Sequence, residues 1–220
     1  MKLASITFIS LFLYINVEGQ KSLTKDEILN SWISQNGNNS KAIVDFDSAW
    51  NARLEMFLDT LQTNKIDSII IFSTAFPGYS SASKCDNGIF PITTFVIWNK
   101  NGKTSIMKIR RRCLSEISSD TSLNFFDFFN DNYKQLKSEY FMPVILGAEM
   151  NKDKSITYSY KWVDHEPNYS FYYTINGNSR SFHFCQSYIE NKESLFRVYN
   201  LGLASYSWWQ EVKNQLEKLE

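Results

Sequence analysis

Glycine and proline are scarce in this sequence, with 8 and 4 residues in a chain of 220. This composition excludes collagen-like and Pro/Gly-rich low-complexity proteins, which need far more of both. Lysine plus arginine and aspartate plus glutamate total 23 each, so the formal net charge is zero. A chain without net charge has no overall field that attracts polyanions, and we predict no nucleic-acid partner.

Common catalytic and cofactor-binding motifs are also missing. The sequence has no Gly-x-Ser-x-Gly, no glycine-rich phosphate-binding loop, no His-Glu-x-x-His and no Cys-x-x-Cys. Because these patterns position nucleophiles, phosphates and metal ions in many enzymes, their absence favours a protein without catalytic activity. We predict no cofactor and no resident metal.

The N-terminus has the features of a bacterial signal peptide over residues 1–19. Lys2 supplies a positive charge, Leu3–Val17 is apolar, and Gly19 is a small residue at the expected cleavage point. The apolar run is shorter than the roughly 20 residues of a membrane-spanning helix. We therefore predict cleavage near Gly19, export to the periplasm or medium, and no stable membrane insertion afterwards.

An exported protein with three cysteines must leave at least one unpaired or bonded to another molecule. Cys85 and Cys113 flank the same predicted strand pair, and we predict a disulfide between them. In the chain-entropy description, such a loop closure stabilises a fold by roughly 3.5 kcal/mol. Cys185 would then be a buried thiol. In the alternative, all three cysteines are reduced and act as small core residues.

Helical periodicity, with apolar residues three and four positions apart, recurs along the chain. The helices expected from it span 24–33, 47–63, 122–138, 190–200 and 207–219. Thr24 and Glu27 form the pattern of a capping box, in which each side chain bonds the other residue's backbone N–H. Trp208, Val212 and Leu216 share one side of the C-terminal helix, which we expect to face the core.

Two isoleucine-rich runs, 66–72 and 92–98, lack alternation, which is typical of strands covered on both faces. Asn101-Gly102 predicts a hairpin between the second run and residues 104–111.

Three later segments, 156–162, 169–175 and 182–184, alternate apolar and polar residues and are expected to form an antiparallel meander. Residues 142–154 are expected to be a connection that could separate two sub-lobes. The fold class is therefore α+β: residues 20–220 form one domain with a mixed or antiparallel sheet. Hairpins over 92–111 and 156–185 are packed by helices, including a C-terminal helix.

The two histidines of the chain, His165 and His183, are the weak catalytic candidates, together with Asp164 and Glu166. Imidazole and carboxylate groups near one another can hold a metal or relay a proton. The alternative is a solvated turn at residues 164–167, whose composition is ordinary for a turn, and a histidine on the polar face of its strand.

A second candidate is the basic hairpin, in which Lys108, Arg110, Arg111 and Arg112 follow one another. Arginine forks suit carboxylate and phosphate groups, so an acidic partner could dock there. Alternation along a strand points successive side chains to opposite faces, however. The alternative is a charged sheet edge that prevents strand-to-strand aggregation.

A third candidate is the long loop 73–91, which carries Phe76, Tyr79 and Cys85. Long irregular loops are often functional, and Phe76 and Tyr79 are candidate binding residues. The alternative is a surface loop held in place by the disulfide.

These observations favour an exported, non-enzymatic domain that binds a protein partner or an envelope component. One alternative is a periplasmic hydrolase or metal-dependent enzyme that uses His165 and His183 with nearby carboxylates. Another is a periplasmic immunity or inhibitor protein, a class in which this size and lack of catalytic motifs are common.

Overall fold

The computed structural model describes residues 22–36, 48–86, 90–118, 123 and 125–219. The predicted signal peptide and its cleavage site lie outside the described residues, as do the first residues of the helices expected at 47–63 and 122–138. Among the described residues, no helix combines the length and apolarity needed to cross a membrane.

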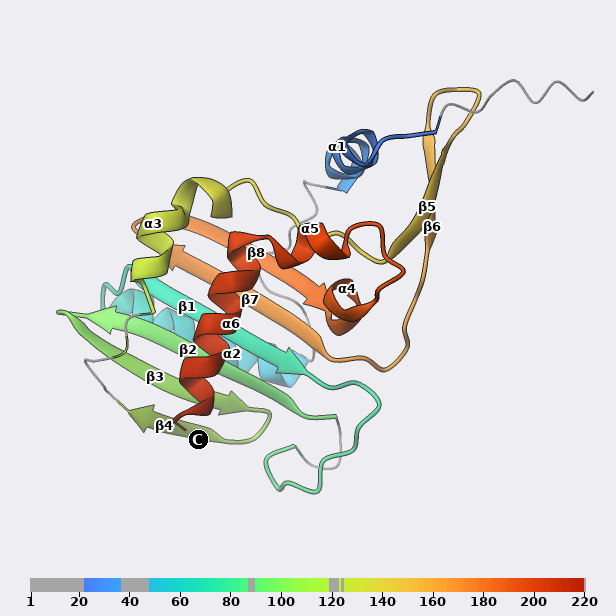
Figure 1. The fold of residues 1–220 in the computed structure, drawn as a ribbon. Helices are drawn as coiled ribbons and strands as arrows, with labels where there is room; N and C mark the ends of the chain where they lie inside the picture. Colours follow the sequence, from blue (N-terminus) through green and yellow to red (C-terminus); the bar gives the residue numbers. More distant parts are fainter. Residues whose placement is uncertain (1–21, 37–47, 87–89, 119–122, 124, 220) are drawn as a thin grey trace, which may run out of the picture.

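The described chain is built around a six-stranded antiparallel sheet (Figure 1). Its strands, in spatial order, are β4 (Leu114–Ser118), β3 (Lys103–Arg110), β2 (Ile92–Lys100), β1 (Ser68–Ala75), β7 (Asn168–Ile175) and β8 (Asn178–Cys185). The predicted α+β class is confirmed, and the sheet is antiparallel throughout rather than mixed.

The central strand β1 is buried on both faces, as its unbroken apolar run predicts. Ile70 and Phe72 belong to the cluster beneath α3 (Asp127–Leu136) and α6 (Ala204–Glu217). Ile69 and Ile71 belong to the opposite cluster, against α2 (Ser48–Thr63). Figure 1 shows α6 crossing one face of the sheet and α2 lying behind the other. Because both faces of β1 are covered, its sequence is a continuous apolar run and does not alternate between apolar and polar residues.

Trp208 is the centre of the larger cluster and is fully buried. Its ring lies 4.8 Å from that of Phe171 and 5.5 Å from that of Tyr173, and its indole N–H donates to the Phe125 carbonyl at 3.0 Å. The C-terminal helix therefore faces the core with the residues that its periodicity predicts.

A two-stranded hairpin, β5 (Ile145–Met150) and β6 (Ile156–Tyr160), extends from the main sheet beside α1 (Lys25–Asn36) (Figure 1). A small apolar cluster that includes Ile28, Ile145 and Phe196 joins this arm to the C-terminal region. The predicted capping box is confirmed: Glu27 accepts from the Thr24 N–H at 2.8 Å, and Thr24 accepts from the Glu27 N–H at 3.2 Å.

Three sequence-based expectations are corrected here. The predicted three-stranded meander is wrong in its first strand, because β6 pairs with β5; its second and third strands do pair, as β7 with β8, and β7 pairs with β1 on its other side. Residues 142–154 contain a strand rather than only a connection. The expected helix 190–200 is replaced by α4 (Gln186–Glu190) and α5 (Arg197–Leu201). Alternation identifies a strand but carries no information about its partner, and the tertiary pairing decides that.

Candidate functional site

A cavity of about 280 Å³ opens where the arm meets the main sheet, and we call it the turn pocket. It brings together the 160–168 segment, the end of β8, and the start of α4. It is lined by Pro77, Pro143, Val144, Tyr160, Lys161, Trp162, Val163, Asp164, His165, Glu166, Asn168, Cys185, Ser187 and Tyr188. Three of the sequence candidates, Asp164, His165 and Glu166, therefore lie together at one cavity.

His165 stands at a close approach between the turn and the long loop. Its φ of 56° and the φ of +84° at Gly78 are both in the left-handed region. A Cβ on Gly78 would meet the His165 side chain at 2.7 Å, so only glycine permits this contact. The imidazole is largely exposed, with its Nδ1 lying 3.3 Å from the Asp164 carboxylate. His165 thus closes the gap between two loops.

Glu166 fixes the turn to α4. Its carboxylate accepts hydrogen bonds from the Ser187 backbone N–H and from the Ser187 hydroxyl, the latter at 2.8 Å. Nearby, the Cys185 thiol donates to the Asn168 side-chain oxygen at 2.9 Å. Glu166 is thus hydrogen-bonded to Ser187, and Cys185 to Asn168. These bonds hold the floor of the pocket in one geometry.

The electrostatics of the pocket floor keep Cys185 protonated. Burial, reinforced by the negative charge of Glu166, raises the pKa of the Cys185 thiol to about 12. Burial also raises the pKa of Tyr188, with added contributions from Cys185 and Glu166. Since the thiolate is the nucleophilic form, this environment is the reverse of one that activates a cysteine.

We predict that Cys185 in the folded protein resists alkylation. At neutral pH, iodoacetamide should modify it at least about a hundredfold more slowly than an unstructured thiol, because less of it is thiolate and it is partly buried. Mass spectrometry with and without urea measures this, and Cys185 should react fully once the chain is unfolded. Rapid modification of the folded chain would contradict the protonated state.

His183 lies elsewhere on β8, opposite Ser170, and is exposed. It does not line the turn pocket, so the structure does not bring the two histidines to one cavity. Among the described residues there is no group of three or more His, Cys, Asp or Glu side chains that could hold a metal ion.

The basic hairpin is largely engaged with the chain itself. Arg110 pairs with the fully buried carboxylate of Asp86, and the buried Arg111 lies 5.6 Å from the Phe90 ring. The Arg112 N–H donates to the Cys85 carbonyl at 2.9 Å, while its side chain is exposed. The predicted disulfide between Cys85 and Cys113 is confirmed and lies in the same region. Together these contacts hold residues 85, 86 and 90 beside the end of β3.

The remaining candidates lie near the same loop. Lys108 stands over the Phe95 ring at 5.4 Å and lines a separate cavity of about 390 Å³ with Phe76. Tyr79 makes an edge contact with Phe76, with ring centroids 6.4 Å apart, and is well exposed. Phe76 therefore lines a different cavity from the turn pocket.

Exposed apolar side chains gather at the rim of the turn pocket. Trp162 is 85% exposed, and Tyr160 and Val163 are exposed beside it. The rings of Tyr158, Tyr160 and Trp162 follow one another at centroid distances of 5.8 and 6.1 Å. Alternation predicts that these three rings lie on one face of a strand. Trp162, the last of the three, is nevertheless exposed to solvent.

No family model matches this chain, and no curated protein or solved structure is significantly similar to it.

Proposed function

We propose that the chain is an exported, non-enzymatic domain that binds a partner protein at the turn pocket. The observation that carries this is Trp162, 85% exposed at the mouth of a cavity with a preorganised floor. Exposed apolar side chains that gather in one patch often mark interaction sites, and tryptophan and tyrosine are enriched among the residues that dominate protein interfaces.

The cavity and the exposed side chains beside it together fit a protein partner. The cavity's volume of about 280 Å³ lies just below the range of roughly 300–1,000 Å³ typical of small-molecule sites. A cavity of this size suits one inserted side chain, and Tyr160, Trp162 and Val163 add exposed apolar surface on one side of it. Insertion of a side chain into a well-packed pocket is usual for a binding hot spot.

The chemistry of the floor also favours binding over catalysis. The Cys185 thiol is neutral, the Glu166 carboxylate is used to hold α4, and His165 is turned toward solvent and Asp164. The Cys85–Cys113 disulfide is compatible with an oxidising compartment, as an exported protein requires. An inhibitor or immunity protein would be one form of such a domain.

The test is affinity capture of the tagged, natively exported chain, followed by titration of the purified partner. We expect Trp162→Ala to weaken binding by about 2 kcal/mol, roughly thirtyfold, without changing the melting temperature. Met56→Ala is a matched control, since Met56 is 72% exposed on α2, away from the pocket. Mass spectrometry of the mature N-terminus tests export in the same experiment.

Equal binding by the wild type and Trp162→Ala would reject the turn pocket as the binding site. A mature chain that still carries residues 1–19 would reject the predicted cleavage. The two results are independent, so either part of the proposal can fail alone.

A further inference from the structure

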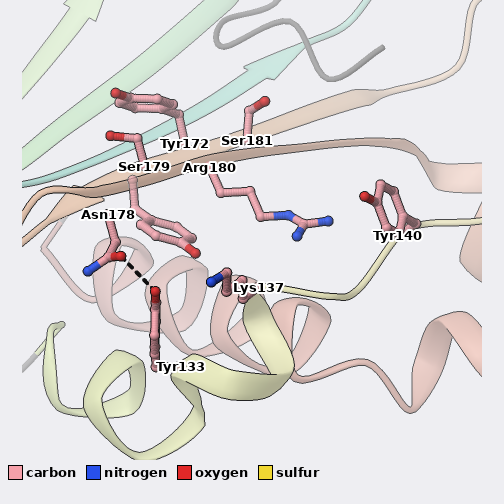
Figure 2. A pocket seen from close by; sticks show the side chains of 9 residues that line it. Tyr133, Lys137, Tyr140, Tyr172, Asn178, Ser179, Arg180 and Ser181 are labelled. Atoms are coloured by element: carbon pink, nitrogen blue, oxygen red, sulfur yellow. Dashed lines mark hydrogen bonds between the residues drawn. The ribbon is translucent and has the colours of Figure 1, made fainter. Parts of the chain in front are cut away.

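A second cavity, of about 350 Å³, lies at the β8 edge of the main sheet, and we call it the edge pocket (Figure 2). No strand among the described residues pairs with the outer side of β8. The cavity is lined by Tyr133, Lys137, Tyr140, Tyr172, Tyr173, Asn178, Ser179, Arg180 and Ser181. It is separate from the turn pocket, with which it shares no lining residue.

The charges of the edge pocket are of one sign. Lys137 and Arg180 are its two cations, and none of its lining residues is acidic. The turn pocket, by contrast, has Asp164 and Glu166 in its lining. In a chain whose net charge is zero, two cations without a carboxylate in one concave site create a local positive potential.

Glu139 is the acidic residue nearest to Lys137 in the sequence, and its carboxylate binds another part of the chain. The Glu139 carboxylate accepts from the backbone N–H groups of Ala204 and Ser205, both at 2.8 Å, and so caps the start of α6. The backbone carbonyl of Glu139, rather than its carboxylate, accepts a hydrogen bond from Arg180 in the edge pocket. Arg180 is thereby anchored without an ion pair to a carboxylate among the described residues.

The guanidinium of Arg180 is held in place before any ligand binds. It lies 4.6 Å from the Tyr140 ring and 5.3 Å from the Phe182 ring. Its Nε is buried and has no hydrogen-bond partner among the described residues. Figure 2 shows the guanidinium reaching toward Tyr140, with Lys137 nearby. A guanidinium held by these contacts presents a planar set of N–H donors, which suits a carboxylate.

The rest of the lining is aromatic and rich in neutral hydrogen-bonding groups. Tyr133 donates to the Asn178 side-chain oxygen at 2.6 Å, which orients the asparagine (Figure 2). Burial raises the pKa of Tyr173 to about 12, so its phenol stays neutral. Tyrosine faces, amide groups and hydroxyls together match a ring that carries several hydroxyl groups.

We propose that the edge pocket binds a carboxylate-bearing sugar, one uronic acid unit at a time. The carboxylate meets Arg180 and Lys137, while the ring and its hydroxyls meet the side chains of Tyr133, Tyr140 and Asn178 beside them (Figure 2). The volume of about 350 Å³ lies at the low end of the range for small-ligand sites, roughly 300–1,000 Å³. A bare inorganic anion would leave the aromatic walls unused.

The test is calorimetric titration of the folded chain with glucuronate, glucose and inorganic phosphate. We expect glucuronate to bind, glucose to bind at least tenfold more weakly, and added salt to weaken the glucuronate affinity. Lys137→Gln should reduce this affinity about fivefold and Arg180→Lys more than tenfold, because lysine lacks the planar fork. Lys152→Gln, an exposed lysine in the β5–β6 turn, is the matched control.

Several outcomes would overturn the proposal. These are binding of neither glucuronate nor an oligouronate, equal binding of glucose, tighter binding of phosphate, or an unchanged affinity in folded Lys137→Gln. Arg180→Lys counts only if its melting temperature is retained, and Lys137→Gln keeps the test decisive if it is not. A free monosaccharide and the end of a polymer offer the same chemistry. An oligouronate is therefore titrated as well, and binding of either form in this pattern supports the site.

Discussion

Replacing Cys85 and Cys113 together by serine is expected to lower the free energy of unfolding by roughly 3.5 kcal/mol. The disulfide joins residues separated by 28 positions, so its removal restores that loop's freedom to the unfolded chain. The folded chain also loses the tether beside the pair between Arg110 and the buried Asp86. Urea denaturation followed by tryptophan fluorescence measures the difference.

Cys185→Ala is the control for this experiment, because Cys185 is the free cysteine. Its substitution should cost less than about 1.5 kcal/mol, since it removes one sulfur atom and one hydrogen bond. A double-serine variant as stable as the wild type would show that the bridge adds nothing to the fold. The predicted loss should also appear when the wild-type chain is unfolded in the presence of reductant.

The elements of this fold that the sequence predicts best are those whose signal is local. The unbroken apolar run of β1 reflects cover on both faces, and the Asn101-Gly102 hairpin joins β2 to β3 with Lys100 opposite Lys103. The strand with which a given strand pairs, in contrast, depends on residues far away in the sequence. The β6 segment has the alternation of a meander strand, yet it pairs with β5, which the sequence does not distinguish from a connection.

For the candidate sites too, the sequence predicts what is local in the chain and not what long-range contacts bring together. The 164–166 turn is recognisable from its polar residues, and it does line a cavity. The residues that define the chemistry of that cavity, Asn168 and Cys185, are adjacent only because β7 and β8 pair. The edge pocket has no sequence signal at all, since Lys137, which follows α3, and Arg180 of β8 line one cavity only in the folded chain. Tertiary structure alone brings these side chains together.

Asn200 connects the fold to the turn pocket, although it does not line it. It is fully buried, and its side chain accepts from the Met142 N–H at 2.9 Å. Its amide donates to the carbonyls of Met142 at 2.8 Å and of Tyr188 at 2.9 Å. Pro143 and Tyr188, on either side of this link, are both part of the pocket lining. Asn200 therefore sets the distance between the arm and α4.

Asn200→Asp should lower the free energy of unfolding by about 3–5 kcal/mol, because a buried carboxylate would replace two donors and face two carbonyl oxygens. Urea denaturation gives the size of the loss. Such a carboxyl group has a higher pKa in the folded than in the unfolded chain, so the loss should be largest at neutral pH. It should shrink as acid protonates the side chain.

Asn191→Asp provides the matched control for the same chemical change. The Asn191 side chain accepts from the Glu193 N–H at 3.0 Å, and an aspartate oxygen can accept that bond equally well. Its effect on the free energy of unfolding should stay within about 0.5 kcal/mol. If Asn200→Asp were equally harmless, the buried amide would not hold the arm. The position of the arm at the turn pocket would then depend on apolar packing, such as the cluster of Ile28, Ile145 and Phe196.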